Sequence, residues 1–202
     1  MNVGNLKITG FLKIYNPETD EEFYDGHNAI HYENFSEAIA QSLINSGQGF
    51  ITEMAFGNGG TSIDSTGIIT YLPTNTSGSN STLYNQTYYK VINQYQSSNT
   101  DATRNNMQVR HIPGTVYTDI FVSCTLDYGE PAGQQAFDNS YLVNDTFVFD
   151  EMGLKSYNGS TADSGKLLTH VIFHPIQKSL NRLIQVDYTI RIQSLTNLST
   201  AA

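Results

Sequence analysis

The clearest structural signal in this sequence lies near its C-terminal end, in the segment Ile184-Gln185-Val186-Asp187-Tyr188-Thr189-Ile190-Arg191-Ile192-Gln193. Apolar and polar side chains alternate strictly along it. Successive side chains of a strand point to opposite faces, so this alternation is typical of a strand with one buried and one solvated face. Strands of this kind occur in antiparallel sheets and sandwiches. The segment therefore predicts a mainly β, antiparallel protein.

The same period of two recurs further upstream. It appears in Leu6 to Ile14, interrupted by Gly10, and in Tyr117 to Leu126, where Cys124 falls on the apolar side. Further strands are expected at 51–56, 84–95, 107–112, 146–149 and 167–173. Turn-forming residues such as Asn158-Gly159 separate these short strands. This pattern predicts an antiparallel β-sandwich or a jelly-roll-like fold.

One amphipathic helix is expected at about 34–46. Its apolar residues share one helical face, at Phe35, Ala38, Ile39 and Leu43. Asn34 is expected to cap the free N–H groups of the first turn, with Glu37 completing a capping box. Gly47 is expected to stop the helix in a left-handed conformation. The helix should plug one end or one face of a sheet.

The chain is expected to form a single β-rich domain over residues 1–193. A polar excursion is expected at about 62–82, because residues 74–82 include no apolar side chain that could pack. Residues 194–202 are expected to form a polar C-terminal tail.

The composition limits the classes of partner. Charged residues make up 14% of the 202 residues, below the usual ~25%, and the net charge is -9. An acidic chain is poorly suited to a phosphate backbone. No apolar run approaches the ~18 residues of a membrane span, and the first residues lack the pattern of a secretory signal. We therefore expect no nucleic acid or membrane partner, and synthesis in a reducing cytoplasm.

The histidines do not follow a metal-binding pattern. His27 and His31 lie four residues apart, as do His170 and His174. The second pair lies in an expected strand, where four residues span roughly 13 Å. The first pair precedes the helix without a His-Glu-x-x-His arrangement, and His111 has no partner nearby in sequence. Polar or packing roles are the better interpretation.

Three further patterns could belong to an active site. Gly57-Asn58-Gly59-Gly60-Thr61 follows an expected strand, as a phosphate loop does, but neither a Gly-Lys-Ser/Thr sequence nor a helix follows it. Cys124 should be a buried thiol. Asp150 and Glu151 are adjacent, so on a strand they should face opposite ways. We predict no catalytic, cofactor-binding or metal-binding residue and no enzymatic activity. A sugar hydrolase would need two carboxylates converging at roughly 5–10 Å.

The expected surface is rich in Asn, Ser, Thr, Gln and Tyr. Low charge weakens the repulsion between identical copies, and Tyr is favoured at interfaces. Such a surface suits repeated contacts between protein subunits. It also suits recognition of a polar saccharide, in which case exposed tyrosines such as Tyr84, Tyr88, Tyr89 or Tyr95 would line a shallow site.

Two parts of the chain carry a resemblance to a known family. The first is His27-Asn28-Ala29-Ile30, the helix, and Ile51-Thr52-Glu53-Met54-Ala55-Phe56-Gly57-Asn58-Gly59-Gly60-Thr61. The second is Glu151-Met152-Gly153-Leu154, then Leu167 to Lys178 with its Phe173-His174-Pro175-Ile176-Gln177-Lys178 end, then the closing strand. Together they resemble the front and back halves of structural proteins from tailed bacteriophages, over roughly 27–61 and 147–193.

The resemblance implies a non-enzymatic virion protein of the tail, neck or baseplate region. Such a protein would be assembled in the host cytoplasm as a homo-oligomer, in contact with copies of itself and other virion proteins. The family contributes no catalytic residues. A capsid decoration protein and a carbohydrate-binding receptor-recognition module are the alternatives.

Overall fold

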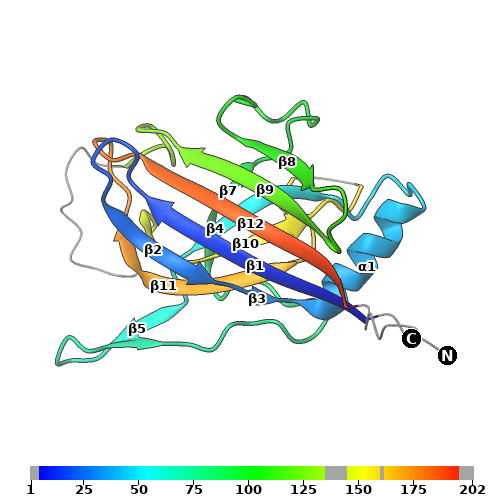
Figure 1. Cartoon of the computed structure of the whole chain (residues 1–202). Helices are drawn as coiled ribbons and strands as arrows, with labels where there is room; N and C mark the ends of the chain where they lie inside the picture. The colour runs from blue at the N-terminus through cyan, green and yellow to red at the C-terminus, as the bar shows by residue number, and fades with distance from the viewer. Residues whose placement is uncertain (1–4, 135–144, 160–161, 196–202) are drawn as a thin grey trace.

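The computed structural model describes residues 5–134, 145–159 and 162–195. Two five-stranded antiparallel sheets pack face to face as a β-sandwich (Figure 1). The first sheet consists, in spatial order, of β2 (Glu22–His27), β1 (Asn5–Tyr15), β12 (Ile184–Leu195), β9 (Tyr117–Leu126) and β8 (Asn106–His111). The predicted mainly β, antiparallel class is confirmed.

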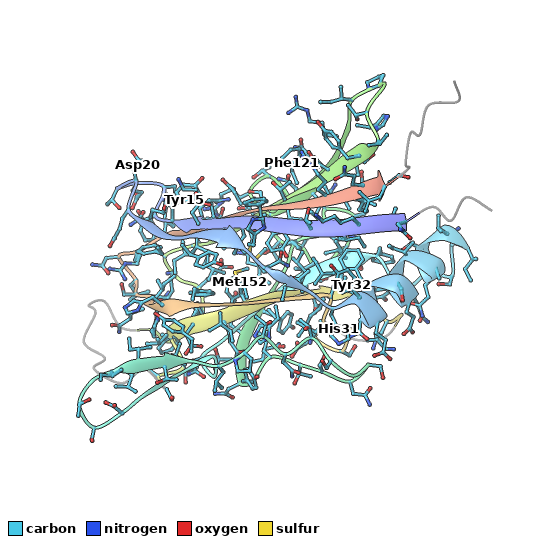
Figure 2. All side chains as sticks on the ribbon, turned by 60° about the horizontal axis from the view of Figure 1, so that its bottom comes forward. Tyr15, Asp20, His31, Tyr32, Phe121 and Met152 are labelled. Atoms are coloured by element: carbon cyan, nitrogen blue, oxygen red, sulfur yellow. The ribbon has the colours of Figure 1, made fainter. Side chains whose placement is uncertain are left out.

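The second sheet consists of β3 (Ala29–Ile30), β11 (Thr169–Gln177), β10 (Val148–Ser156), β4 (Ile51–Gly57) and β7 (Gln86–Val91). A separate two-stranded ribbon pairs β5 (Thr61–Ile63) with β6 (Ile69–Tyr71). It projects from one end of the sandwich, and helix α1 (Tyr32–Leu43) lies at the other end (Figures 1 and 2). Within the described ranges, no helix has the length and apolar character needed to cross a membrane.

The core lies between the two sheets and follows the predicted alternation. Val186, Tyr188 and Ile190 of β12 are almost completely buried and belong to the same apolar cluster as Met152 of β10. Figure 2 shows Met152 between the two layers and Phe121 on the outer side of the first sheet. Cys124 is buried, as predicted, and burial raises the pKa of its thiol to about 12.

Helix α1 begins earlier than the sequence suggested. His31, not Asn34, is the N-cap: its Nδ1 accepts the backbone N–H of Asn34 at 3.2 Å. The Asn34 amide instead donates to the carbonyl of Leu167 at 2.8 Å, because Asn34 faces the second sheet. The prediction of an Asn34 cap was therefore wrong. A neutral imidazole with a free ring nitrogen can accept the same N–H bond that an Asn side chain would.

The end of α1 also differs from the prediction. The last helical residue is Leu43, and Asn45 adopts the left-handed conformation with φ 52°. Gly47 also has a positive φ, of 75°, but lies further along the exit loop. Glu37 does not reach back to a cap; it pairs with Lys166 at 2.5 Å, which ties the helix to the loop before β11.

The strand boundaries shift by a few residues in several places. β7 covers only Gln86–Val91 of the predicted 84–95, and β11 covers Thr169–Gln177, later than the predicted 167–173. β12 continues through Leu195, into the predicted tail. Residues 196–202, the rest of the predicted tail, lie outside the described residues.

Candidate functional site

The two neighbouring strands β10 and β4 of the second sheet are buried on both faces, which distinguishes them from the strands of the first sheet. Every residue of β10 is buried, as are all residues of β4 except Ile51. The inner face meets the first sheet, while the outer face is covered by the chain that follows β6 and by the loop after β10. On the outer side, Leu83 closes over Ala55 and Leu167 as a small second apolar cluster.

A cluster of ionisable side chains lies under this cover. We define the carboxylate cluster as Asp150, Glu151 and His170, all with no exposed surface. Glu151 accepts backbone N–H bonds from Gly59 at 3.1 Å, Asn85 at 2.8 Å and Tyr84 at 2.9 Å. Its two oxygens therefore hold two loops that are distant in sequence.

Asp150 binds the next two amides of the same glycine-rich loop. Its oxygens accept the N–H of Gly60 and of Thr61, each at 2.9 Å, and also the Thr61 hydroxyl. The loop that could have been a phosphate cradle is thus occupied by carboxylates of this chain. Successive N–H groups in a turn form an anion-binding concavity, and here the anions are internal.

The prediction that Asp150 and Glu151 face opposite ways was therefore wrong. Both side chains reach the loop 59–61. The pairing of β10 with β11 shifts register between Phe149 and Glu151. A bulge of this kind re-aims a side chain out of the regular alternation, so neighbouring carboxylates can serve one loop.

His170 links the cluster to the segment between β6 and β7. Its Nδ1 accepts the backbone N–H of Asn75 at 2.7 Å, so the proton of the neutral ring lies on Nε2, which donates to Glu151 at 3.0 Å. His31 acts similarly. Its Nδ1 is used by the helix cap, so its Nε2–H donates to the carbonyl of Gly78 at 3.0 Å.

The pKa values of the two carboxyl groups move in opposite directions. Burial alone would raise the pKa of Glu151, but the hydrogen bonds from His170, Asn85 and Tyr84 together outweigh it and hold that pKa below its usual range. At Asp150, burial outweighs the bonds from Thr61 and Gly60, and the pKa is raised. Of these two carboxyl groups, Glu151 is accordingly the one that the folded state favours in its charged form.

Close packing explains the glycines of the motifs around this cluster. A Cβ on Gly153 would lie 2.1 Å from the carbonyl oxygen of Thr169, and one on Gly57 would lie 2.5 Å from that of Asn85. Both oxygens of Glu151 and both ring nitrogens of His170 already have partners. The arrangement is suited to clamping loops onto the sheet, with its polar atoms turned inward.

The remaining candidate residues are placed separately by the structure. His27 packs against Phe11 in a tilted arrangement with 3.8 Å between ring centres, His174 contacts the Tyr71 hydroxyl at 3.2 Å, and His111 bonds to Thr118 at 3.0 Å. In the parts of the chain that the structure describes, no three His, Cys, Asp or Glu side chains form a group that could hold a metal ion.

The four tyrosines considered for a saccharide site do not share one face. Tyr88 turns toward the core and packs on Phe56, with ring centres 6.3 Å apart, while its neighbour Tyr89 lies on the other face of β7. Tyr84 packs on His170 and donates its hydroxyl to the carbonyl of Pro73. Tyr95 is 85% exposed.

A large apolar groove lies at the end of the sandwich that carries α1. Its volume is about 1020 Å³, and it runs between α1, the segments 49–51 and 93–96, and β8. Apolar side chains dominate its lining, among them Ile39, Leu43, Phe50, Tyr95 and Val109. None of the described residues along it carries a charge.

Sequence reasoning missed the carboxylate cluster and the groove. One signal for the cluster was present: Asp150 and Glu151 interrupt an apolar strand, and His170 interrupts another. Charged side chains within buried strands need partners, so these positions indicated internal contacts. The groove has no comparable signal, since it depends on how the helix, β8 and two loops meet.

Comparison of the chain with known protein families, with curated proteins and with solved structures finds no match.

Proposed function

We propose that this chain is a non-enzymatic structural protein of a tailed-bacteriophage virion, in the tail, neck or baseplate region. It acts through contacts between subunits: with copies of itself and with other virion proteins. Its place of action is the virion, after assembly in the host cytoplasm.

The observation that carries the proposal is the meeting of the two segments that resemble such proteins. The Gly57 to Thr61 loop belongs to the first segment, and Asp150 and Glu151 lie at the start of the Glu-Met-Gly-Leu strand of the second. These carboxylates accept three successive amides of that loop. The quoted motifs thus form one physical unit, which supports reading them together as the signature of one fold.

The exposed surface gives a second line of support. Leu43, Ile44, Tyr95 and Val109 are each more than 70% exposed, and they lie in or beside the charge-free groove. Contiguous exposed apolar surface marks interaction sites more often than it marks a free monomer surface. Subunit contacts would cover this surface.

The test is to locate the protein in particles. Phage particles produced by cells that carry the gene are purified, heads and tails are separated, and each fraction is analysed by mass spectrometry. We expect peptides of this chain in the tail fraction at a stoichiometry of several copies per particle. In parallel, size-exclusion chromatography with light scattering measures the mass of the purified protein.

Each outcome bears on the proposal. Peptides found only with heads would replace it with the capsid decoration alternative. A glycan-binding signal from a chain confined to the tip of the tail would favour the receptor-recognition alternative. A monomer that is absent from all particle fractions would overturn the proposal.

A further inference from the structure

The ribbon formed by β5 and β6 is an exposed arm, which we define as residues 61–72. The pairs Thr61–Tyr71 and Ile63–Ile69 place these four side chains on one face. Ile63, Ile68 and Tyr71 are 41%, 63% and 50% exposed. At the base of this face Thr61 is buried against Asp150 and the Tyr71 hydroxyl contacts His174, while Ile63 and the nearby Ile68 are open to solvent. A two-stranded ribbon is marginally stable alone in water, and exposed apolar side chains add to that cost. The arm is therefore built to be covered by something else.

The single charge at the tip of the arm is exposed and hydrogen-bonded to its own loop. Asp64 is the one charged residue of the segment 61–72. Its carboxylate accepts the N–H of Thr66 at 2.7 Å, the Thr66 hydroxyl at 2.6 Å and the N–H of Ile68 at 3.0 Å. These bonds lower the pKa of Asp64 and turn its charge back into the loop. The exposed Ile68 therefore lies beside a carboxylate that is already hydrogen-bonded within the loop.

The apolar groove matches the arm in chemistry. The described groove residues are uncharged, and three of its apolar side chains, Leu43, Tyr95 and Val109, are 80%, 85% and 72% exposed. The chain as a whole is acidic, with a net charge of -9. The arm carries one carboxylate, Asp64, which is hydrogen-bonded to its own loop. Since burying an unpaired charge is costly, the uncharged groove and this arm are well suited to meet each other on an acidic protein.

The rim of the groove also offers backbone bonds. β8 is an edge strand of the first sheet. The Gln94 side chain bonds both the N–H and the carbonyl of Met107, at 2.9 and 2.8 Å, so these backbone groups point away from β9. In an antiparallel pair this direction alternates, so the backbone groups of Val109 and His111 also point away from β9. An extended segment that enters the groove can pair with them.

The arm and the groove lie at opposite ends of the sandwich, as both views show (Figures 1 and 2). The arm of a subunit is therefore out of reach of its own groove. A contact between the two surfaces joins different copies, and it is heterologous, because each copy contributes a different surface. Such contacts give a ring if the rotation closes and a filament if it does not.

We infer that the arm of one copy of this chain, with Ile63, Ile68 and Tyr71, occupies the apolar groove of the next copy between α1 and β8. Copies then associate head to tail. This inference rests on the proposed function, because it names the subunit contact through which that function works.

The test uses one variant of each surface. Ile68→Asp places a charge at the tip of the arm, and Leu43→Asp places one in the groove. Both side chains are largely exposed, so the fold is retained, which circular dichroism checks. The matched controls are Ser62→Asp on the other face of the arm and Ala40→Asp on α1 outside the groove lining.

Light scattering is expected to show that each of the two variants weakens self-association at least about 30-fold, as loss of an interface hot spot does, while the controls associate like the wild type. Mixed together, the two variants retain one intact arm and one intact groove, and they should form 1:1 pairs that grow no further. Equal association of all proteins, or the absence of mixed pairs, would overturn the inference.

A cross-linking measurement detects association that is too weak for light scattering. Ile68→Cys and Val109→Cys are made separately and mixed under mild oxidation; Cys124 is fully buried and does not interfere. A disulfide between the two different variants is expected. Cross-links only between identical variants, or none, would contradict the arm-in-groove contact.

The two proposals fail separately. If the chain is found in particles and the arm and groove variants do not change its self-association, the proposed function stands and this inference is overturned. If the arm pairs with the groove in solution but the chain is absent from every particle fraction, this inference stands and the proposed virion role is overturned.

Discussion

The two sheets use their polar side chains in opposite ways. On the outer face of the first sheet, charged groups such as Lys13 with Glu22, and Arg191 with Asp119, form pairs at or near the solvent. On the outer face of the second sheet, Glu151 and His170 are completely buried under other parts of the chain. Apolar and polar residues alternate in the sequence of strands whose outer face meets water. The alternation is absent in strands whose outer face is buried by other segments of the chain.

The difference also assigns different tasks to the two layers. The first sheet presents long regular ladders, with β12 paired to β1 and β9 along almost its whole length. Register shifts occur in three pairings of the second sheet and in one pairing of the first, β1 with β2. The second sheet is also held to its covering segments by side chains such as Glu53 and Lys155, which both bond to Asp163. The first layer acts as a framework, while the second anchors the segments that precede and follow the arm.

The largest effect is expected from a substitution in the buried face of the first sheet. Val186 is fully buried on the inner face of β12, and Val186→Asp would place an unpaired carboxylate between the sheets. Burying a carboxyl group without a partner, together with the lost packing of the valine, removes a large share of the ~5–15 kcal/mol that stabilises a typical domain, so the variant should not accumulate as folded protein. Circular dichroism and soluble yield measure this outcome.

Thr189→Asp is the matched control for that substitution. It lies on the outer face of the same strand, where it should change the free energy of unfolding by less than about 1 kcal/mol. If Val186→Asp and Thr189→Asp unfolded at similar denaturant concentrations, the assignment of inner and outer faces would be wrong.

A smaller effect is expected from the buried anchor of the second sheet. Glu151→Ala removes the acceptor of three backbone amides and the partner of His170, leaving these groups buried without a bond. We expect a loss of about 3–5 kcal/mol in unfolding free energy, measured by urea denaturation. Glu22→Ala, which breaks an exposed pair of the first sheet, should cost less than about 1 kcal/mol.

Hydrogen exchange locates the effect of Glu151→Ala. The amides of Asn75, Tyr84 and Asn85 should lose protection before the amides of β12 do, because the cluster holds the segment before β7. Uniform loss of protection over both sheets would contradict a local anchoring role.

Much of the framework could be predicted from the sequence, and the reason is physical. The outer face of β12 meets solvent, so apolar and polar residues alternate along its sequence. The core positions Val186, Tyr188 and Ile190 and the buried thiol of Cys124 followed from that period alone. Local rules were less reliable at α1, because the tertiary bond from Asn34 to Leu167 took over the side chain expected to cap the helix.

The carboxylate cluster could not be assembled from sequence spacing. Glu151, His170 and the Gly59 to Thr61 loop come together only after β4, β10 and β11 pair in a particular register. The bulge at Asp150 then reverses the direction expected for its side chain. A charged residue inside an apolar strand indicates that a partner exists, but pairing decides which partner it is.

The smallest effect is expected in the pH dependence of stability, compared for one aspartate from each sheet. The bonds from Arg191 outweigh burial and lower the pKa of Asp119, so its contribution to stability is present above the ordinary value of roughly 4 and is lost as the pH falls through the folded pKa. The advantage of the wild type over Asp119→Asn should therefore shrink below about pH 4. Burial raises the pKa of Asp150, so the folded state binds its proton more readily than the unfolded state does. The difference between wild type and Asp150→Asn should accordingly move in favour of the wild type as the pH falls toward 4. Urea midpoints measured from pH 7 to pH 3 give both trends, and parallel trends would mean that the two outer faces are equally solvated.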